Sequence, residues 1–107
     1  MKINTLATYK NLKGEEIKYT ETKSPITLGN VLSEIVLTQR QDKKGFRPLD
    51  SWDLAKKFAN EKEVEINLSD FVQLKELVED STLFYTMIIA QTLEALERSR
   101  LTEEIKK

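Results

Sequence analysis

The side chains in this sequence that could carry out chemistry are limited to hydroxyls, amines and carboxylates. The 107-residue chain contains no histidine and no cysteine. Their absence removes the commonest general base, the commonest metal ligands and the commonest activated nucleophile. A lysine-activated serine needs at least a Ser-x-x-Lys spacing, which neither Ser51 nor Ser69 has. With three glycines, the chain also contains neither a P-loop nor a dinucleotide-binding fingerprint.

Carboxylates are plentiful and often adjacent. They fall at Glu15–Glu16, at Glu61, Glu63 and Glu65, at Glu79–Asp80 and at Glu103–Glu104. A catalytic pair needs a concave, partly desolvated site that separates the two pKa values, whereas these acids fall on predicted exposed faces or helix ends. Glu63 and Glu65 share one strand face, but two carboxylates supply too few oxygens for a hard cation. We therefore expect no enzyme, with no catalytic residue, metal site, cofactor or small-molecule substrate.

Composition favours one soluble domain over residues 1–107, since 39% of the residues are apolar and 33% are charged. The net charge of -1 hides an asymmetry, because residues 1–60 carry +4 and residues 61–107 carry -5. Such a split could steer a charged partner or orient copies head to tail. The alternative is an ordinary fold with unevenly scattered surface charge.

The sequence predicts a cytosolic protein. No apolar run follows Met1-Lys2, so no signal peptide is expected. The strongest apolar run, Leu83–Ala90, is far shorter than the ~20 residues that span a bilayer. We therefore expect no membrane partner.

The expected fold class is α+β, with a small three-stranded antiparallel sheet packed against about four helices. An N-terminal hairpin over residues 2–21, turning at Asn11–Gly14, supplies two strands, and the alternating segment 63–68 supplies the third. Apolar spacing predicts helices over about 28–40, 51–59, 70–79 and 82–98, with a frayed tail over 99–107. Thr27, Asp50 and Ser69 are the expected N-caps of the first three helices.

The segment 83–96 carries apolar residues on nearly every face and must be covered by its own chain or by a partner. Trp52 falls beside the apolar stripe of its helix, where it could anchor an interface or cover the end of a small core. The expected partner contacts, either to another protein or to a second copy, are Trp52, Phe46, Tyr85, Ile89, Leu93 and Leu96.

A rival function is nucleic-acid binding through the basic loop 40–47 and helix 51–59. Basic residues that flank an aromatic side chain can serve a phosphate backbone or stack a base. An ordinary solvated loop with Phe46 at the edge of the core is the alternative. The expected nucleic-acid contacts are Arg40, Lys43, Lys44, Arg47, Lys56 and Lys57.

Several segments between residues 25 and 97 are similar to one group of known proteins. They are Thr27-Leu-Gly-x-Val31, Trp52-Asp-Leu-Ala-x-Lys57, Glu63-Val-Glu-Ile-x-Leu-Ser-x-Phe71, Leu74-Lys-Glu-Leu-Val78 and Gln91-x-Leu93-x-x-Leu96-Glu97. Together they resemble small uncharacterised accessory proteins of tailed bacteriophages and prophages, from which the basic loop Arg40–Arg47 departs. The resemblance implies a phage or mobile-element context and a non-enzymatic accessory role, which would place the protein in the cytoplasm of a bacterial host. The apolar segment 83–96 and the lack of catalytic residue types predict that this role is exercised through protein–protein interaction, either with another protein or with a second copy.

Overall fold

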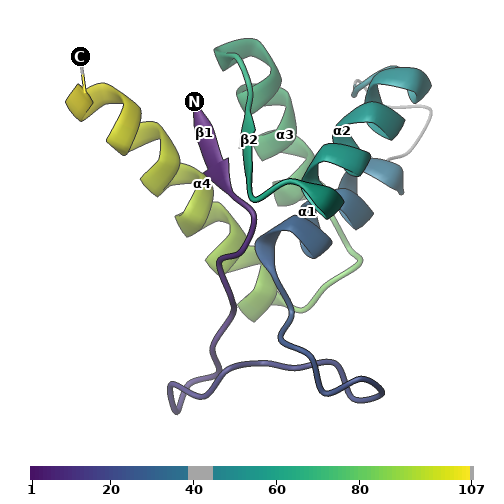
Figure 1. Ribbon diagram of the computed structural model, residues 1–107, viewed down its shortest axis with the longest axis vertical. Helices are drawn as coiled ribbons and strands as arrows, with labels where there is room; N and C mark the ends of the chain where they lie inside the picture. The colour runs from purple at the N-terminus through teal and green to yellow at the C-terminus, as the bar shows by residue number, and fades with distance from the viewer. Residues whose placement is uncertain (39–44, 107) are drawn as a thin grey trace.

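The computed structural model describes residues 1–38 and 45–106, with side chains as far as residue 101 at the C-terminal end. The elements follow in the order β1 (Lys2–Asn4), α1 (Leu28–Leu37), α2 (Pro48–Asn60), β2 (Glu63–Glu65), α3 (Leu68–Asp80) and α4 (Thr86–Lys106). β1 lies between α4 and β2, and the segment that joins β1 to α1 forms two loops away from both chain ends (Figure 1).

In the described part of the chain the sheet has two strands, so the expected three-stranded sheet is wrong. β1 pairs antiparallel with β2, and Ile3 stands opposite Val64. Both of these side chains are buried, whereas their neighbours on each strand are exposed. The α+β class remains reasonable in the coarser sense that helices pack against a small antiparallel sheet.

The two regular strands of the hairpin expected over residues 2–21 do not form because β1 ends at Asn4. The expected turn does form, since the Gly14 N–H donates to the Asn11 carbonyl (3.0 Å) and Gly14 has a positive φ of 84°. The side-chain oxygen of Asn4 accepts a hydrogen bond from the Leu6 N–H (3.0 Å). This local bond makes an Asx turn, which competes with continuation of the strand. β1 pairs with β2 instead, about 60 residues further along the chain.

Three extended but irregular segments, around Tyr9, Ile17 and Ile26, take the place of the regular strands. The N–H of Ile17 donates to the Tyr9 carbonyl (2.8 Å), and the Ile17 carbonyl accepts from the Ile26 N–H (3.0 Å). Isolated bridges pair Lys10 with Glu16, Lys18 with Pro25 and Thr8 with Thr27. These hydrogen bonds therefore satisfy backbone N–H and C=O groups of the segment between β1 and α1 without regular strands.

α1 and α2 approach each other closely at Gly29. α1 begins after Thr27, the expected N-cap, and ends at Leu37 and not near residue 40. A Cβ atom added to Gly29 would lie 2.9 Å from the Thr5 Cβ and closer still to the Phe58 carbonyl oxygen. Glycine is required here because any other side chain would push the two helices apart.

α2 and α3 both begin earlier than expected. Arg47 is the N-cap of α2, and the helix starts at Pro48 because proline at the first position has no N–H to satisfy. Asp50 is therefore in the first turn and is not the cap. In α3 the Asn67 side chain accepts from the Asp70 N–H (2.8 Å), so Asn67 and not Ser69 is the cap. With Asn67 as the cap of α3, the strand expected over residues 63–68 is shorter and ends at Glu65.

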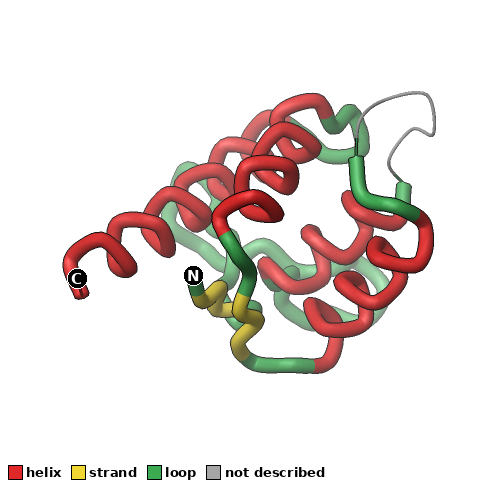
Figure 2. Tube along the Cα trace, turned by 90° about the horizontal axis from the view of Figure 1, so that it is seen from above, coloured by secondary structure: helices red, strands yellow, loops and turns green. Residues whose placement is uncertain are grey.

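α4 also departs from the expected bounds. It begins at Thr86 and not near residue 82, because the Leu83 N–H donates to the Ser81 hydroxyl (3.3 Å) within a loop. It continues to Lys106, whereas the sequence predicted a frayed tail from residue 99. Figure 2 shows the last turns of α4 extending past the rest of the molecule.

Ion pairs along α4 explain its extra length. Arg98 lies 3.7 Å from Glu94 four residues earlier, and the Arg100 Nε donates to Glu97 (2.9 Å). Such pairs at three- and four-residue spacing stabilise a helix that has few tertiary contacts. Glu97 also lies 3.8 Å from Lys75 of α3. The hydrogen bond from Arg100 is the main reason that the pKa of Glu97 is lowered.

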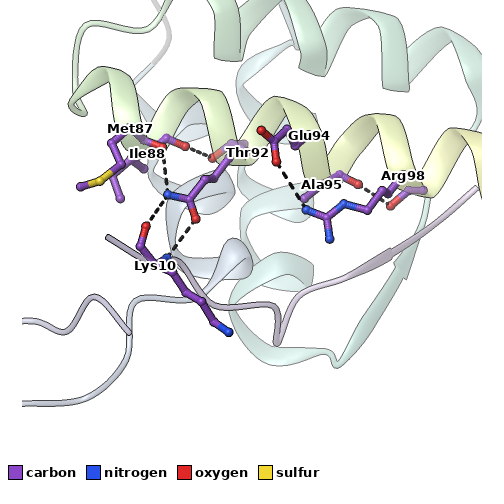
Figure 3. A network of polar contacts seen from close by, with 9 residues as sticks. Lys10, Met87, Ile88, Thr92, Glu94, Ala95 and Arg98 are labelled. Atoms are coloured by element: carbon purple, nitrogen blue, oxygen red, sulfur yellow. Dashed lines mark hydrogen bonds and ion pairs between the residues drawn. The ribbon is translucent and has the colours of Figure 1, made fainter. Parts of the chain in front are cut away.

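Two polar contacts attach α4 to the N-terminal segment, and Figure 3 shows the one at the Lys10 backbone. In the core, the hydroxyls of Tyr9 and Thr92 lie 2.7 Å apart, and Thr92 also donates to the Ile88 carbonyl (2.8 Å). Next to it, the Gln91 amide accepts from the Lys10 N–H (2.9 Å) and donates to the Lys10 carbonyl (2.7 Å). α4 is therefore joined both to a buried side chain and to the backbone of this segment.

Gly29→Ala should lower the free energy of unfolding by about 3 kcal/mol, because the new methyl group meets backbone atoms that cannot move aside easily. Urea unfolding followed by circular dichroism measures the change. Glu34→Ala, at an exposed position of the same helix, should change it by less than about 0.5 kcal/mol. An equally stable Gly29→Ala protein would show that the two helices do not approach so closely.

Burial raises the pKa of Tyr9 from 10.0 to about 12. The stability that comes from keeping this phenol neutral is present below pH 10 and is lost as the pH rises through 12. Between these two pH values, the wild-type protein should lose about 2–3 kcal/mol more than Tyr9→Phe does. Denaturant unfolding at stepped pH measures the difference. Tyr85→Phe, at an exposed tyrosine, should leave the wild-type slope unchanged.

Candidate functional site

Four of the six expected partner contacts are covered by the chain itself. Leu96 is fully buried and Phe46 is buried in the core. Ile89 and Leu93 are half-buried and pack against the same core. The chain therefore covers the segment 83–96 in part, since Leu83, Tyr85 and Met87 of the same segment stay exposed.

The other two expected contacts, Trp52 and Tyr85, are exposed on different parts of the molecule. Tyr85 is 85% exposed in the loop before α4, and Trp52 is 54% exposed in the first turns of α2. The structure does not bring them together. Trp52 has an exposed apolar neighbour on its own helix.

Leu49 is that neighbour, three residues before Trp52 and 78% exposed. Side chains three residues apart lie on the same side of a helix. The Lys56 Nζ lies 5.8 Å from the centroid of the Trp52 ring, within cation–π range, and 3.5 Å from Asp53. We call an apolar pair and the positive charge that follows it the α2 surface; its residues are Leu49, Trp52 and Lys56.

α3 carries a similar pattern, in which an exposed apolar pair is followed by negative charges in place of the positive charge. Leu68 is 63% exposed and Val72, four residues later, is 48% exposed. Glu76 continues the same line and Glu79 lies one turn beyond Glu76, both exposed. We call these four residues the α3 surface. This surface was not predicted from the sequence, although Leu68 and Val72 lie four residues apart and outside the inward-facing positions of α3, a spacing that could have revealed it.

The expected nucleic-acid contacts are only partly placed. Arg40, Lys43 and Lys44 lie outside the described residues. Arg47 lies 3.5 Å from Asp50, and Lys56 is similarly paired with Asp53. Neighbouring carboxylates reduce the positive potential that these two side chains offer to a phosphate backbone.

Comparisons with protein-family models, curated proteins and solved structures find no match to this chain.

A groove between β1 and α4 is a further feature that the sequence analysis did not identify. It has a volume of about 310 Å³, and its apolar lining residues are Ala7, Leu28 and Ala95. Lys2 and Arg98 line it with positive charge. Asn4, Glu63 and Ser99 complete the lining.

The described residues contain no group of three or more carboxylates that could hold a metal ion. Within the same residues, none of the helices has the length and apolar character needed to cross a membrane.

Trp52→Ala should lower the free energy of unfolding by less than about 1 kcal/mol, because the indole is largely outside the core. Phe58→Ala, on the buried face of the same helix, should lower it by about 3–5 kcal/mol. Urea unfolding of both variants gives the comparison. Equal losses would place Trp52 in the core and remove it as a contact residue.

Proposed function

We propose that this protein is a non-enzymatic accessory protein of a tailed phage or prophage that acts through protein–protein contact and associates with itself. The phage context rests on the resemblance of segments between residues 25 and 97 to such proteins. The exposed pair Leu49 and Trp52 is the observation that carries the proposed contact. Tryptophan buries a large area at little cost in conformational entropy and is enriched among the residues that dominate interface energies.

The position of this pair favours a preformed contact. Both residues stand on α2, whose Gly29-mediated packing against α1 holds its backbone in place. A side chain on a rigid helix loses less freedom on binding than one on a loop. The α2 surface can therefore bind without a preceding rearrangement.

A second copy of the chain is the partner that the charges favour. The α2 surface places Lys56 after its apolar pair, and the α3 surface places Glu76 after Leu68 and Val72. If α2 of one copy packs parallel to α3 of another, apolar residues meet apolar residues and the lysine meets the glutamate. The spacing matches, since each charge follows the second apolar residue by four positions.

Such a contact is heterologous because it joins two different surfaces. Each copy then keeps one α2 surface and one α3 surface available, so association continues to a ring or an open chain of copies. The charge asymmetry between residues 1–60 and 61–107 supports the same head-to-tail direction.

The test uses sedimentation velocity at increasing protein concentration, together with the fluorescence of Trp52, which is the only tryptophan in the chain. The wild-type mass should rise with concentration while Trp52 emission shifts to the blue and acrylamide quenching falls. Trp52→Ala and Val72→Asp should each abolish association, because every copy then lacks one of the two surfaces that form the contact. Tyr85→Ser, which removes an exposed aromatic ring elsewhere, should associate like the wild type.

Mixing the two variants tests the direction of the contact. Trp52→Ala retains its α3 surface and Val72→Asp retains its α2 surface, so the mixture should form a heterodimer and stop there. A strict monomer at high micromolar wild-type concentration would falsify self-association. A wild-type assembly that both variants leave intact would place the contact on another surface.

A further inference from the structure

We propose that the hollow between the loop over residues 19–25 and the first turn of α1 binds a neutral saccharide. This site is separate from the α2 and α3 surfaces, and it does not depend on self-association. Three observations carry it: the fixed shape of the loop, the mixture of rings and hydrogen-bonding groups around the hollow, and the balance of the charges beside it.

Backbone hydrogen bonds hold the loop in one shape. The Tyr19 N–H donates to the Ser24 carbonyl (2.9 Å), and the Tyr19 carbonyl accepts from the Lys23 N–H (2.9 Å). Lys23 has a positive φ of 57°, a left-handed conformation that few residues other than glycine adopt. Figure 1 shows the loop as the second of the two that precede α1. A hollow whose walls are already formed loses little freedom when it takes up a ligand.

The hollow has the size and the mixed lining of a small-molecule site. Its volume is about 610 Å³. Tyr19 and Pro25 contribute rings to the lining, and Thr20, Thr22 and Ser24 contribute hydroxyls. A sugar ring presents C–H groups that pack on such rings, and each of its hydroxyls both donates and accepts hydrogen bonds. The lining therefore matches both parts of a saccharide.

Asn30 of α1 adds hydrogen-bond donors to this lining. The side-chain oxygen of Asn30 accepts from the Thr27 hydroxyl (2.6 Å), and the oxygen of that hydroxyl accepts from the Asn30 backbone N–H (3.3 Å). These two bonds hold the amide by its oxygen. Among the described residues, no group accepts a hydrogen bond from the side-chain nitrogen of Asn30. Its two N–H groups are therefore available to the oxygen atoms of a ligand.

The charges beside the hollow balance one another. Glu21 lines it, and Glu34 lies close enough to Tyr19 to affect the phenol: burial, and after it the Glu34 carboxylate, raises the pKa of Tyr19. Lys18 precedes Tyr19, and Lys23 lies within the loop. Two negative and two positive charges leave no net field that would attract an anion or a cation. A neutral ligand is the one that this balance favours.

The experiment titrates the ¹⁵N-labelled full chain with methyl β-glucoside, methyl β-galactoside and N-acetylglucosamine. At least one of them should shift the side-chain amide resonance of Asn30 and the backbone amides of residues 19–24. Binding should be weak, with a Kd of about 1–10 mM, because every lining residue except Asn30 is exposed. Sodium phosphate and methylammonium chloride should each bind about 5-fold more weakly or not at all. Absence of a shift with all three sugars at about 50 mM, or tighter binding of either ion, would overturn the proposal.

Three variants assign the binding to the hollow. Asn30→Asp retains the oxygen that accepts from Thr27 and suits the first turn of a helix, but it lacks the N–H donors, so binding should weaken about 5-fold. Tyr19→Ala should abolish binding, whereas Tyr19→Phe, which retains the ring, should weaken it by less than about 3-fold.

Tyr85→Ala, which removes an exposed ring elsewhere, is the control and should bind like the wild type. Resonances outside residues 19–34 show whether each variant is folded. Unaltered binding to Asn30→Asp or to Tyr19→Ala would overturn the proposal. None of these outcomes bears on the self-association of the chain.

Discussion

Gln91 contacts the backbone of Lys10 with both ends of its amide, and next to it Thr92 meets the hydroxyl of Tyr9 in the core. Together these contacts give α4 partners in the irregular segment that precedes α1. The hydrogen bonds to the Lys10 backbone lie at the surface, where water can replace them, whereas the bond between Tyr9 and Thr92 is buried and has no such substitute. The buried contact and the surface contact together hold the irregular N-terminal segment against α4, beside a sheet that has two strands in the described part of the chain.

The helical part of the fold could be predicted from the sequence because the residues responsible for it are local. The five apolar residues that the spacing assigns to the inner face of α1, from Leu28 to Val36, are all buried in the structure. Thr27 caps the same helix through its side chain, as its position suggested. Spacing and caps of this kind act within one or two turns, so a single sequence displays them.

The sheet and the surfaces could not be predicted because they depend on contacts across long separations or on competition between neighbours. Asn4 could have continued a strand but forms a turn with Leu6, and Asn67 competed with Ser69 for the same cap. The burial of Leu96 and the exposure of Leu68 depend on which helix packs beside each residue. Side-chain type alone does not determine these outcomes, so the sequence could not tell which candidate contact residues are exposed in the fold.

The partners of the N-terminal segment are far away along the chain. The hydroxyls of Tyr9 and Thr92 are separated by 83 residues, and the Met1 amine donates to a carbonyl 65 residues later. Contacts at such separations form late and slow the folding of a domain. During synthesis, residues 1–27 therefore leave the ribosome well before α4 exists to hold them. Over that interval the edge of β1 is a place where a nascent chain can pair with a chaperone or with another chain.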